Sequence, residues 1–254
     1  MIADRFRLDG RAALVTGASR GLGAAMARAL AEAGADVVLH SSRVQMRDAA
    51  EAIGRDCSVR AMCLVADLAS RADAGRLVAE AVAALGRLDI LVNNAGIIRR
   101  TAAVDYADAD WDEVIEVNLS SVFRLCREAG RHMLERGSGK IVNIASLLSF
   151  QGGIRVPAYT AAKGGVAQLT KALANEWASK GINVNAIAPG YMRTDNTRAL
   201  MEDPIRYKEI TQRIPAGRWG EPHDLAGGVV FLCSPAADYI HGHVLVVDGG
   251  WMAR

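Results

Sequence analysis

The segment T-G-A-S-R-G-L-G, residues 16–23, joins an apolar run to a long Ala-rich stretch, and this arrangement predicts the fold. The apolar run, 11–17, is typical of a buried strand. The stretch at about 22–33 has the pattern of a helix that ends at Gly34. A strand, a glycine-rich turn and a helix in this order are typical of the first unit of a nucleotide-binding sheet.

Glycines give the turn its expected function, because they permit positive φ angles and a close approach of backbone to ligand. The helix that follows presents unpaired N–H groups and the positive end of its dipole to a pyrophosphate. A glycine-rich turn without a ligand is the alternative, but the position between a strand and a helix favours binding. We expect cofactor contacts from Gly17, Ser19, Arg20, Gly21, Leu22 and Gly23.

Short apolar runs alternate with longer helical periods along the rest of the chain. Strands are expected at 35–40, 59–67, 88–94, 140–146, 182–188 and 244–248. Helices are expected at about 44–54, 71–85, 109–136 and 157–180, with two or three helical pieces over 195–233. The alternation predicts an α/β fold, a Rossmann-like doubly wound parallel sheet of about seven strands with helices on both faces. Without a linker or a repeat, we expect residues 1–254 to form a single domain.

Composition excludes several classes of function. The 254 residues contain no apolar run near the roughly 20 that a membrane helix needs, and residues 1–10 lack the core of a secretory signal. The net charge of +2 comes from interspersed charges, so a nucleic-acid partner is not indicated. We therefore expect a cytoplasmic protein that acts on a small molecule.

Cysteine and histidine do not indicate a metal centre. No C-x-x-C pair occurs, and the cysteines are expected in the core of a protein from a reducing compartment: Cys57, Cys63, Cys126 and Cys233. His241 and His243 form an H-x-H pair that would share one face of a strand. Because no third ligand is evident, a structural or surface role is favoured and no metal is expected.

Two further strand ends carry residues that suit a dinucleotide. Asp67, followed by Leu68, closes the third expected strand and could accept a hydrogen bond from an adenine amino group. A helix N-terminal carboxylate is an equally good interpretation of Asp67 alone. The turn N-N-A-G, 93–96, supplies small residues beside a ribose, with Asn93 stabilising the turn and cofactor contacts from Asn94, Ala95 and Gly96. Such strand ends together are typical of a switch-point crevice.

The end of the second strand leaves the choice of cofactor open. An NAD site usually carries an acidic residue there, whereas this chain has His40, Ser41, Ser42 and Arg43. No carboxylate would repel a 2′-phosphate, and Arg43 or Arg20 would attract one. These residues favour tolerance of NADP, although a neutral strand end also accepts NAD.

The candidate catalytic groups follow the fifth strand. Ser146 closes the run I-V-N-I-A-S, and thirteen residues later Tyr159 begins the spacing Y-x-x-x-K with Lys163. On a helix, Tyr159 and Lys163 lie one turn apart on one face. A nearby ammonium favours the phenolate and brings the pKa of a tyrosine closer to neutrality. Ser146 would then hold a substrate oxygen while Tyr159 transfers its proton; an amphipathic helix with a solvated lysine is the plainer alternative.

Together these residues resemble the short-chain dehydrogenase/reductase family over nearly the whole chain. The resemblance rests on the glycine turn, Asp67, N-N-A-G, Asn118, Ser146, Y-x-x-x-K, Pro189 with Gly190 and Thr194, and the ending V-D-G-G. It implies a nicotinamide cofactor, NAD or NADP, and a homotetramer. It also implies a catalytic tetrad of Asn118, Ser146, Tyr159 and Lys163, with nicotinamide contacts from Pro189, Gly190, Met192 and Thr194. Taken alone, Asn118 is a buried amide that needs hydrogen-bond partners, and a structural role explains it equally well.

Longer segments resemble the branch of this family that acts on deoxy-sugar acids. They are 93–100, 149–159, 173–178, 214–220 and 247–254. A sugar acid needs cations and amides in its site, and the candidates beside Ser146 and Tyr159 are Gln151 and Arg155 first, then Arg99, Arg193 and Arg198. Each arginine alone is as well explained as a surface charge or a subunit contact.

Two other functions remain open from the sequence. A reductase of another carbonyl, such as a 3-oxoacyl thioester, would use the same groups on a longer apolar substrate. A non-catalytic dinucleotide sensor would need only the cofactor-binding half, so an intact tetrad argues against it. Trp251 near the chain end is expected to be exposed and to pack on a neighbouring subunit.

Overall fold

The computed structural model describes residues 1–43 and 46–254. In this part of the chain, seven parallel strands form one sheet in the order β3-β2-β1-β4-β5-β6-β7. The strands are β1 (Ala12–Val15), β2 (Asp36–Ser41), β3 (Ala61–Val65), β4 (Ile90–Asn93), β5 (Gly139–Ile144), β6 (Ile182–Pro189) and β7 (Val244–Val247). The predicted Rossmann-like parallel sheet is therefore confirmed.

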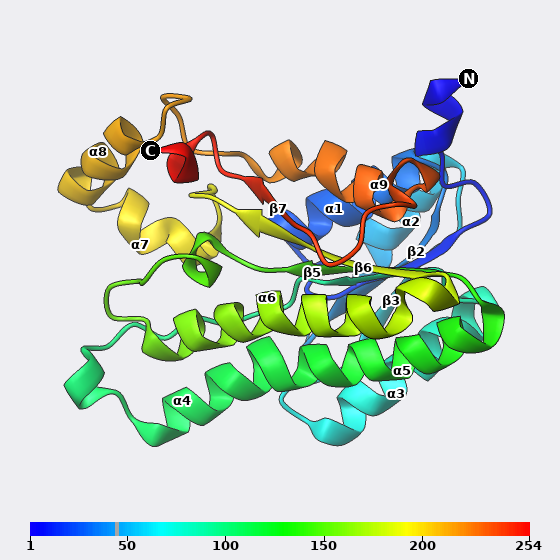
Figure 1. Cartoon of the computed structure of the whole chain (residues 1–254), viewed down its shortest axis with the longest axis horizontal. Helices are drawn as coiled ribbons and strands as arrows, with labels where there is room; N and C mark the ends of the chain where they lie inside the picture. Colours follow the sequence, from blue (N-terminus) through cyan, green and yellow to red (C-terminus); the bar gives the residue numbers. More distant parts are fainter. Residues whose placement is uncertain (44–45) are drawn as a thin grey trace.

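Helices cover both faces of the sheet (Figure 1). They are α1 (Gly21–Glu32), α2 (Arg47–Cys57), α3 (Arg71–Leu85), α4 (Asp108–Ile115), α5 (Ser121–Arg136), α6 (Pro157–Trp177), α7 (Arg198–Met201), α8 (Pro204–Arg213) and α9 (Ala226–Cys233). One apolar core joins the sheet to α1, α2 and α9, and a second joins its other face to α3, α5 and α6. Because helices pack on both faces, β1, β4 and β6 are buried at every position.

The helices differ from expectation in two places. The helix predicted over 109–136 contains a π-helical turn at Glu116–Ser120, which joins α4 to α5. The helix predicted at 44–54 begins at Arg47 and extends to Cys57, and positions 44 and 45 lie outside the described residues. The region 195–233 forms α7, α8 and α9 with short 3₁₀ turns between them.

The structure corrects two expectations, one about the cysteines and one about the H-x-H pair. Cys126 and Cys233 are buried, but Cys57 and Cys63 are only half-buried, because Cys63 lies on the edge strand β3 and Cys57 ends the helix beside it. His241 and His243 precede β7 and are not strand residues, so no strand alternation places them on a common face. Among the described residues no group of three metal-binding side chains occurs.

The topology fixes the position of a crevice. β1 pairs with β2 on one side and with β4 on the other, so the chain winds in opposite directions from this point. Loops diverge there at the carboxyl ends of the strands, which is where open α/β sheets bind ligands. α7 and α8 lie at this same end of the sheet, next to the chain's C-terminus (Figure 1). Within the described residues, no helix is both long and apolar enough to cross a bilayer.

Candidate active site

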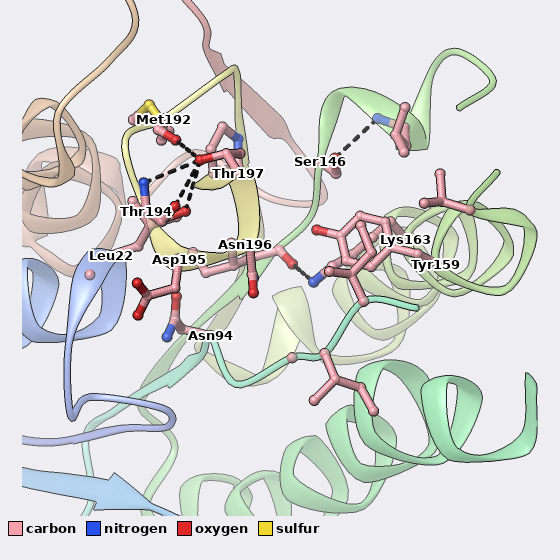
Figure 2. Close-up of a pocket in the computed structure, with 18 of the residues that line it drawn as sticks. Leu22, Asn94, Ser146, Tyr159, Lys163, Met192, Thr194, Asp195, Asn196 and Thr197 are labelled. Carbon is pink, nitrogen blue, oxygen red and sulfur yellow. Dashed lines mark hydrogen bonds between the residues drawn. The ribbon is translucent and has the colours of Figure 1, made fainter. Parts of the chain in front are cut away.

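A cavity of about 1000 Å³ opens at the carboxyl ends of the strands. The glycine turn lines one end, and Ser146, Tyr159 and Lys163 line another part of it. In Figure 2 the loop that contains Met192 and Thr194 lies between Leu22 on one side and Ser146 and Tyr159 on the other. The cavity contains every residue that the sequence predicted to contact the cofactor: Gly17, Ser19, Arg20, Gly21, Leu22, Gly23, Ser41, Ser42, Arg43, Asp67, Leu68, Asn94, Ala95, Gly96, Tyr159, Lys163, Pro189, Gly190, Met192 and Thr194.

Close packing explains the glycines of the turn. Gly17 and Gly21 have φ angles of +63° and +56°, which other residues rarely adopt. A Cβ on Gly23 would lie 2.2 Å from the carbonyl oxygen of Gly17 and 2.5 Å from the amide nitrogen of Asn94. The Asn94 Nδ2 group donates to the carbonyl oxygens of Thr16 at 2.9 Å and of Gly17 at 3.1 Å. Asn94 therefore supports the glycine turn from the loop that follows β4, a contact that the sequence did not predict.

Asn93 was expected to stabilise the turn at 93–96, but its side chain bonds elsewhere. Its Nδ2 donates to Oδ1 of Asn143 at 2.9 Å and contacts the Cys126 sulfur. Asn93 belongs to a buried polar network between β4, β5 and α5.

His40 links three strand ends and supports the turn from a third direction. Its Nδ1 accepts the N–H of Gly17 at 3.3 Å, and Nε2–H donates to the carbonyl oxygen of Ala66 at 3.0 Å. Burial lowers the pKa of His40 below its ordinary value, which favours the neutral ring that this bonding requires. Ser42 and Arg43 follow in exposed positions at the cavity edge. His40 in β2 therefore has a structural role, and the candidate contacts to the cofactor ribose come from the residues that follow it in the chain.

Asp67 follows β3 and lies three residues before Ser70, which caps α3, so it is not the helix N-terminal carboxylate that was the alternative interpretation. It lines the cavity, while its Oδ1 accepts the N–H of Ala69 at 3.0 Å. Its own N–H donates to Asp73 at 2.9 Å, and Ser70 caps the helix. The carboxylate is thus fixed by local turn bonding at a position that a cofactor could reach.

The candidate catalytic side chains come from the end of β5 and the start of α6. Pro157 occupies the first turn of α6, where the missing N–H carries no penalty, so Tyr159 and Lys163 lie one helical turn apart. The Lys163 Nζ donates to the carbonyl oxygen of Ile144 at 2.6 Å and lies 5.6 Å from the Tyr159 ring centroid. Ser146 caps the short turn after β5 and faces Tyr159 (Figure 2).

The pKa shifts in this group differ from the simple expectation. Burial raises the pKa of Tyr159, while a hydrogen bond with Ser146 and the charge of Arg100 lower it. Burial lowers the pKa of Lys163 to about 8. Lys163 was expected to be the cation that lowers the pKa of Tyr159. Its ammonium instead donates to the Ile144 carbonyl oxygen. The positive charge that opposes the rise in the pKa of Tyr159 comes from Arg100.

Asn118 lies in the π-helical turn and is completely buried. Its Oδ1 accepts the N–H of Ile97, and its Nδ2 donates to the carbonyl oxygen of Ile97, both at 2.8 Å. The amide therefore fixes the loop after β4, and it is not among the residues that line the cavity. This is the structural role that the residue alone suggested. A π-turn is the kind of local irregularity that occurs near functional sites.

Of the five side chains expected to bind substrate, Arg155, Arg193 and Arg198 are not among the described residues that line the cavity. Arg155 is exposed and has a φ of +64°. Its carbonyl oxygen accepts the N–H of Thr101, and the described hydrogen bonds include none for its side chain. Arg193 pairs with Glu221 at 3.1 Å and donates to the Tyr207 hydroxyl. The Arg155 side chain is thus exposed, and Arg193 is already paired.

The other two expected substrate residues do line the cavity, but Arg99 already has partners. Its guanidinium pairs with Glu113 at 2.7 Å and with Asp110 at 3.6 Å. Gln151 is in place and accepts the indole N–H of Trp251 at 3.2 Å. Trp251 itself is only 4% exposed, so its predicted packing on a neighbouring subunit is wrong; the ring forms part of the cavity wall.

Sequence reasoning missed several lining residues that carry charge or a hydroxyl. They are Arg100, Glu113, Tyr191, Asp195, Thr197, Arg206, Glu209 and Arg213. Arg100 donates to the carbonyl oxygen of Asn196 at 2.8 Å, which connects two loops over the cavity. Arg100 lies in the loop after β4, beside the predicted Arg99, and no periodicity in this loop distinguishes the two arginines. Nothing local in the sequence distinguishes Arg206 and Arg213 from other helix-surface arginines.

The loop after β6 joins the two parts of the cavity. Thr197 Oγ1 donates to the carbonyl oxygen of Met192 at 2.5 Å and accepts the N–H of Thr194 at 3.2 Å, which makes the loop compact (Figure 2). Asp195 pairs with Arg20 of the glycine turn at 2.9 Å. The loop is thus held against the start of α1, with Thr194 beside Gly21.

Known proteins match this chain along its whole length. A family model described as enoyl-(acyl carrier protein) reductase matches residues 17–252. The 2-dehydro-3-deoxy-D-gluconate 5-dehydrogenase of Dickeya dadantii is 52% identical over 258 residues, which is all of both chains. A crystal structure of a 2-deoxy-D-gluconate 3-dehydrogenase, described as putative, from Agrobacterium tumefaciens with bound NADP has a TM-score of 0.92 and 55% identity, covering 98% of this chain and 99% of that one. A gluconate 5-dehydrogenase from Burkholderia cenocepacia, in complex with NADP and tartrate, has a TM-score of 0.94 and 42% identity over the full length of both chains.

Proposed function

This chain belongs to the short-chain dehydrogenase/reductase family of NAD(P)-dependent oxidoreductases, and from that premise we propose that it interconverts a secondary alcohol and a ketone on a deoxy-sugar acid. The reaction type is that of the 2-dehydro-3-deoxy-D-gluconate 5-dehydrogenases, also described as 2-deoxy-D-gluconate 3-dehydrogenases. The supporting observation is that Ser146, Tyr159 and Lys163 share one cavity with the glycine turn. Relatives that are about half identical over their full length carry this activity in their names.

Tyr159 is the proposed acid–base group. In the oxidative direction its phenolate takes the hydroxyl proton of the substrate, and Ser146 holds the same oxygen. The bound nicotinamide supplies the hydride acceptor or donor. Lys163, one helical turn below, orients the site through its bond to Ile144 and would contact the cofactor ribose. Asn118 acts by fixing the loop at Ile97 rather than by touching the substrate.

The cofactor residues predicted from the sequence support either NAD or NADP. The end of β2 carries Ser42 and Arg43 and no carboxylate that would repel a 2′-phosphate. Solved relatives contain NADP. A panel of sugar acids assayed with both cofactors, read by absorbance of the reduced nicotinamide, tests the proposal. Turnover of 3-oxoacyl thioesters but of no sugar acid would favour the alternative reductase, and no turnover of any ketone would favour a sensor.

Arg100 is the cation that we expect to acidify Tyr159, and this can be tested by a pH profile. Removing its charge in Arg100→Gln should raise the pKa of Tyr159, so the acidic limb of the oxidation rate moves to higher pH. At pH 7 we expect kcat to fall about fivefold, since a charge in a partly solvated site contributes on the order of 1 kcal/mol. Arg100→Lys keeps the charge and should keep the limb in place. An unchanged profile in both variants would contradict the assignment.

We also propose that the protein is a single domain, cytoplasmic and a homotetramer. Exposed aromatic side chains on the outer helices suit subunit contacts: Trp111 of α4 is 40% exposed, and Phe123 of α5 is 43% exposed. Sedimentation of the pure protein distinguishes a tetramer from a dimer or monomer.

A further inference from the structure

Three of the arginines that line the cavity have no carboxylate partner among the described residues: Arg43, which follows β2, Arg100 and Arg213. Arg99 pairs with Glu113, and Arg206 pairs with Glu209 at 2.7 Å. Arg100 bonds only to a carbonyl oxygen, and Arg213 has no ion pair within the described part of the chain. Uncompensated guanidinium groups beside a cavity are suited to an anionic ligand, because their N–H forks match a carboxylate.

Arg213 is positioned by an aromatic platform. It ends α8, and its guanidinium lies 3.9 Å from the centroid of the Trp251 ring. Trp251 is fixed in turn by its bond to Gln151 and by the Tyr191 ring, whose centroid is 4.7 Å away. Stacking restricts the guanidinium and leaves its N–H groups available. The charge is therefore held in place without being neutralised.

The Tyr191 hydroxyl lies within the field of the same arginines. Burial raises the pKa of Tyr191, and the charges of Arg206, Arg213 and Arg100 oppose this shift. The described hydrogen bonds include none for this hydroxyl, so it can donate to a ligand. The phenol and the guanidinium groups supply hydrogen-bond donors that suit a carboxylate, while Glu209, which also lines the cavity, is paired with Arg206.

Arg100 relates the Tyr191 hydroxyl to Tyr159, the proposed acid–base group. Its charge acts on both Tyr159 and Tyr191, whereas Arg213 and Arg206 act on Tyr191. All of these side chains line the same cavity, which Arg213 reaches from the end of α8 and Tyr159 from the first turn of α6. A substrate that spans the two would present its carboxylate to Arg213 and a hydroxyl several bonds away to Tyr159.

We propose that Arg213, supported by Trp251 and joined by Tyr191, binds the substrate carboxylate and selects acids over uncharged sugars. This inference rests on the proposed sugar-acid dehydrogenase function and adds the residue that recognises the acid. It replaces Arg155 and Arg193, which lie outside the cavity.

The test compares Arg213→Gln with the unmodified enzyme on a sugar acid and on the primary amide of the same acid. A lost charge-assisted bond of about 1.5–3 kcal/mol corresponds to a KM for the acid raised roughly 10- to 150-fold. We expect kcat to stay within about twofold, the KM for the amide to be unchanged, and Arg213→Lys to recover part of the loss. Lys208→Gln, which removes an exposed charge from the same helix, is the control and should behave like the unmodified enzyme.

A second readout does not depend on turnover. Tartrate should bind the unmodified enzyme and bind Arg213→Gln at least tenfold more weakly in calorimetry. Equal KM changes for acid and amide, or unchanged tartrate binding, would overturn the assignment of Arg213. If the unmodified enzyme turns over no sugar acid, the proposed function fails instead, so the two failures are distinguishable.

Discussion

Tyr159→Phe should reduce kcat on a sugar acid by about a thousandfold while leaving cofactor affinity within about twofold. The substitution removes one hydroxyl and keeps the ring that packs at the start of α6. General acid–base groups typically contribute a factor of about 10²–10⁴. Tyr159 is the described side chain whose hydroxyl bonds to Ser146, and this bond opposes the rise in pKa that burial causes. Steady-state kinetics and fluorescence titration of the reduced cofactor measure the two effects separately.

The second phenol of the cavity provides a matched control for this experiment. Tyr191→Phe removes a hydroxyl from the same cavity, but from the region near Arg213 rather than near Ser146. We expect it to raise KM for the acid severalfold and to change kcat little. If Tyr159→Phe kept more than a few per cent of the turnover, the assignment of Tyr159 as the proton-transfer group would be wrong. The same would follow if Tyr191→Phe lowered kcat more than Tyr159→Phe does.

Local sequence patterns predicted the fold because each pattern indicates the type of secondary structure that its own residues form. Strand runs such as 182–188 and the glycine turn have signals that tertiary structure does not override. The π-turn at Glu116–Ser120 had no such signal, because its residues are ordinary helix residues. Cys63 was misplaced because the sequence does not reveal which strands form the edges of the sheet.

The site was predictable only where spacing along the chain determines position in space. Tyr159 and Lys163 are one helical turn apart, and the glycines must follow β1, so both were correctly brought to one cavity. The substrate residues depend instead on how loops fold back over the sheet. Arg155 was chosen for its proximity to Tyr159 in sequence, yet its side chain is exposed and is not among the described residues that line the cavity. Arg213 and Trp251, distant in sequence, reach the cavity from α8 and the chain end.

Lys163→Met should abolish most activity and yet stabilise the fold at neutral pH. Lys163 is 4% exposed, and burial lowers its pKa to about 8 from an ordinary value of 10.5. Holding the charged form in the folded protein therefore costs about 3 kcal/mol below pH 8. Methionine fills similar space without charge, but it leaves the Ile144 carbonyl oxygen without its partner, which costs about 1–2 kcal/mol. We expect a net gain of about 1–2 kcal/mol in the free energy of unfolding at pH 7.

The dependence on pH separates this cause from simple better packing. Between about pH 8 and 10.5 the folded protein releases the Lys163 proton while the unfolded chain still holds it, so the unmodified enzyme gains stability as pH rises. The advantage of Lys163→Met in denaturant unfolding, measured at one protein concentration, should thus shrink between pH 7 and pH 10. Lys171→Met, at an exposed position of the same helix, should show no such trend. A methionine advantage that is independent of pH, or a methionine variant less stable at pH 7, would mean that the buried ammonium imposes no cost, and that Lys163 is not a charge kept in the core for its function.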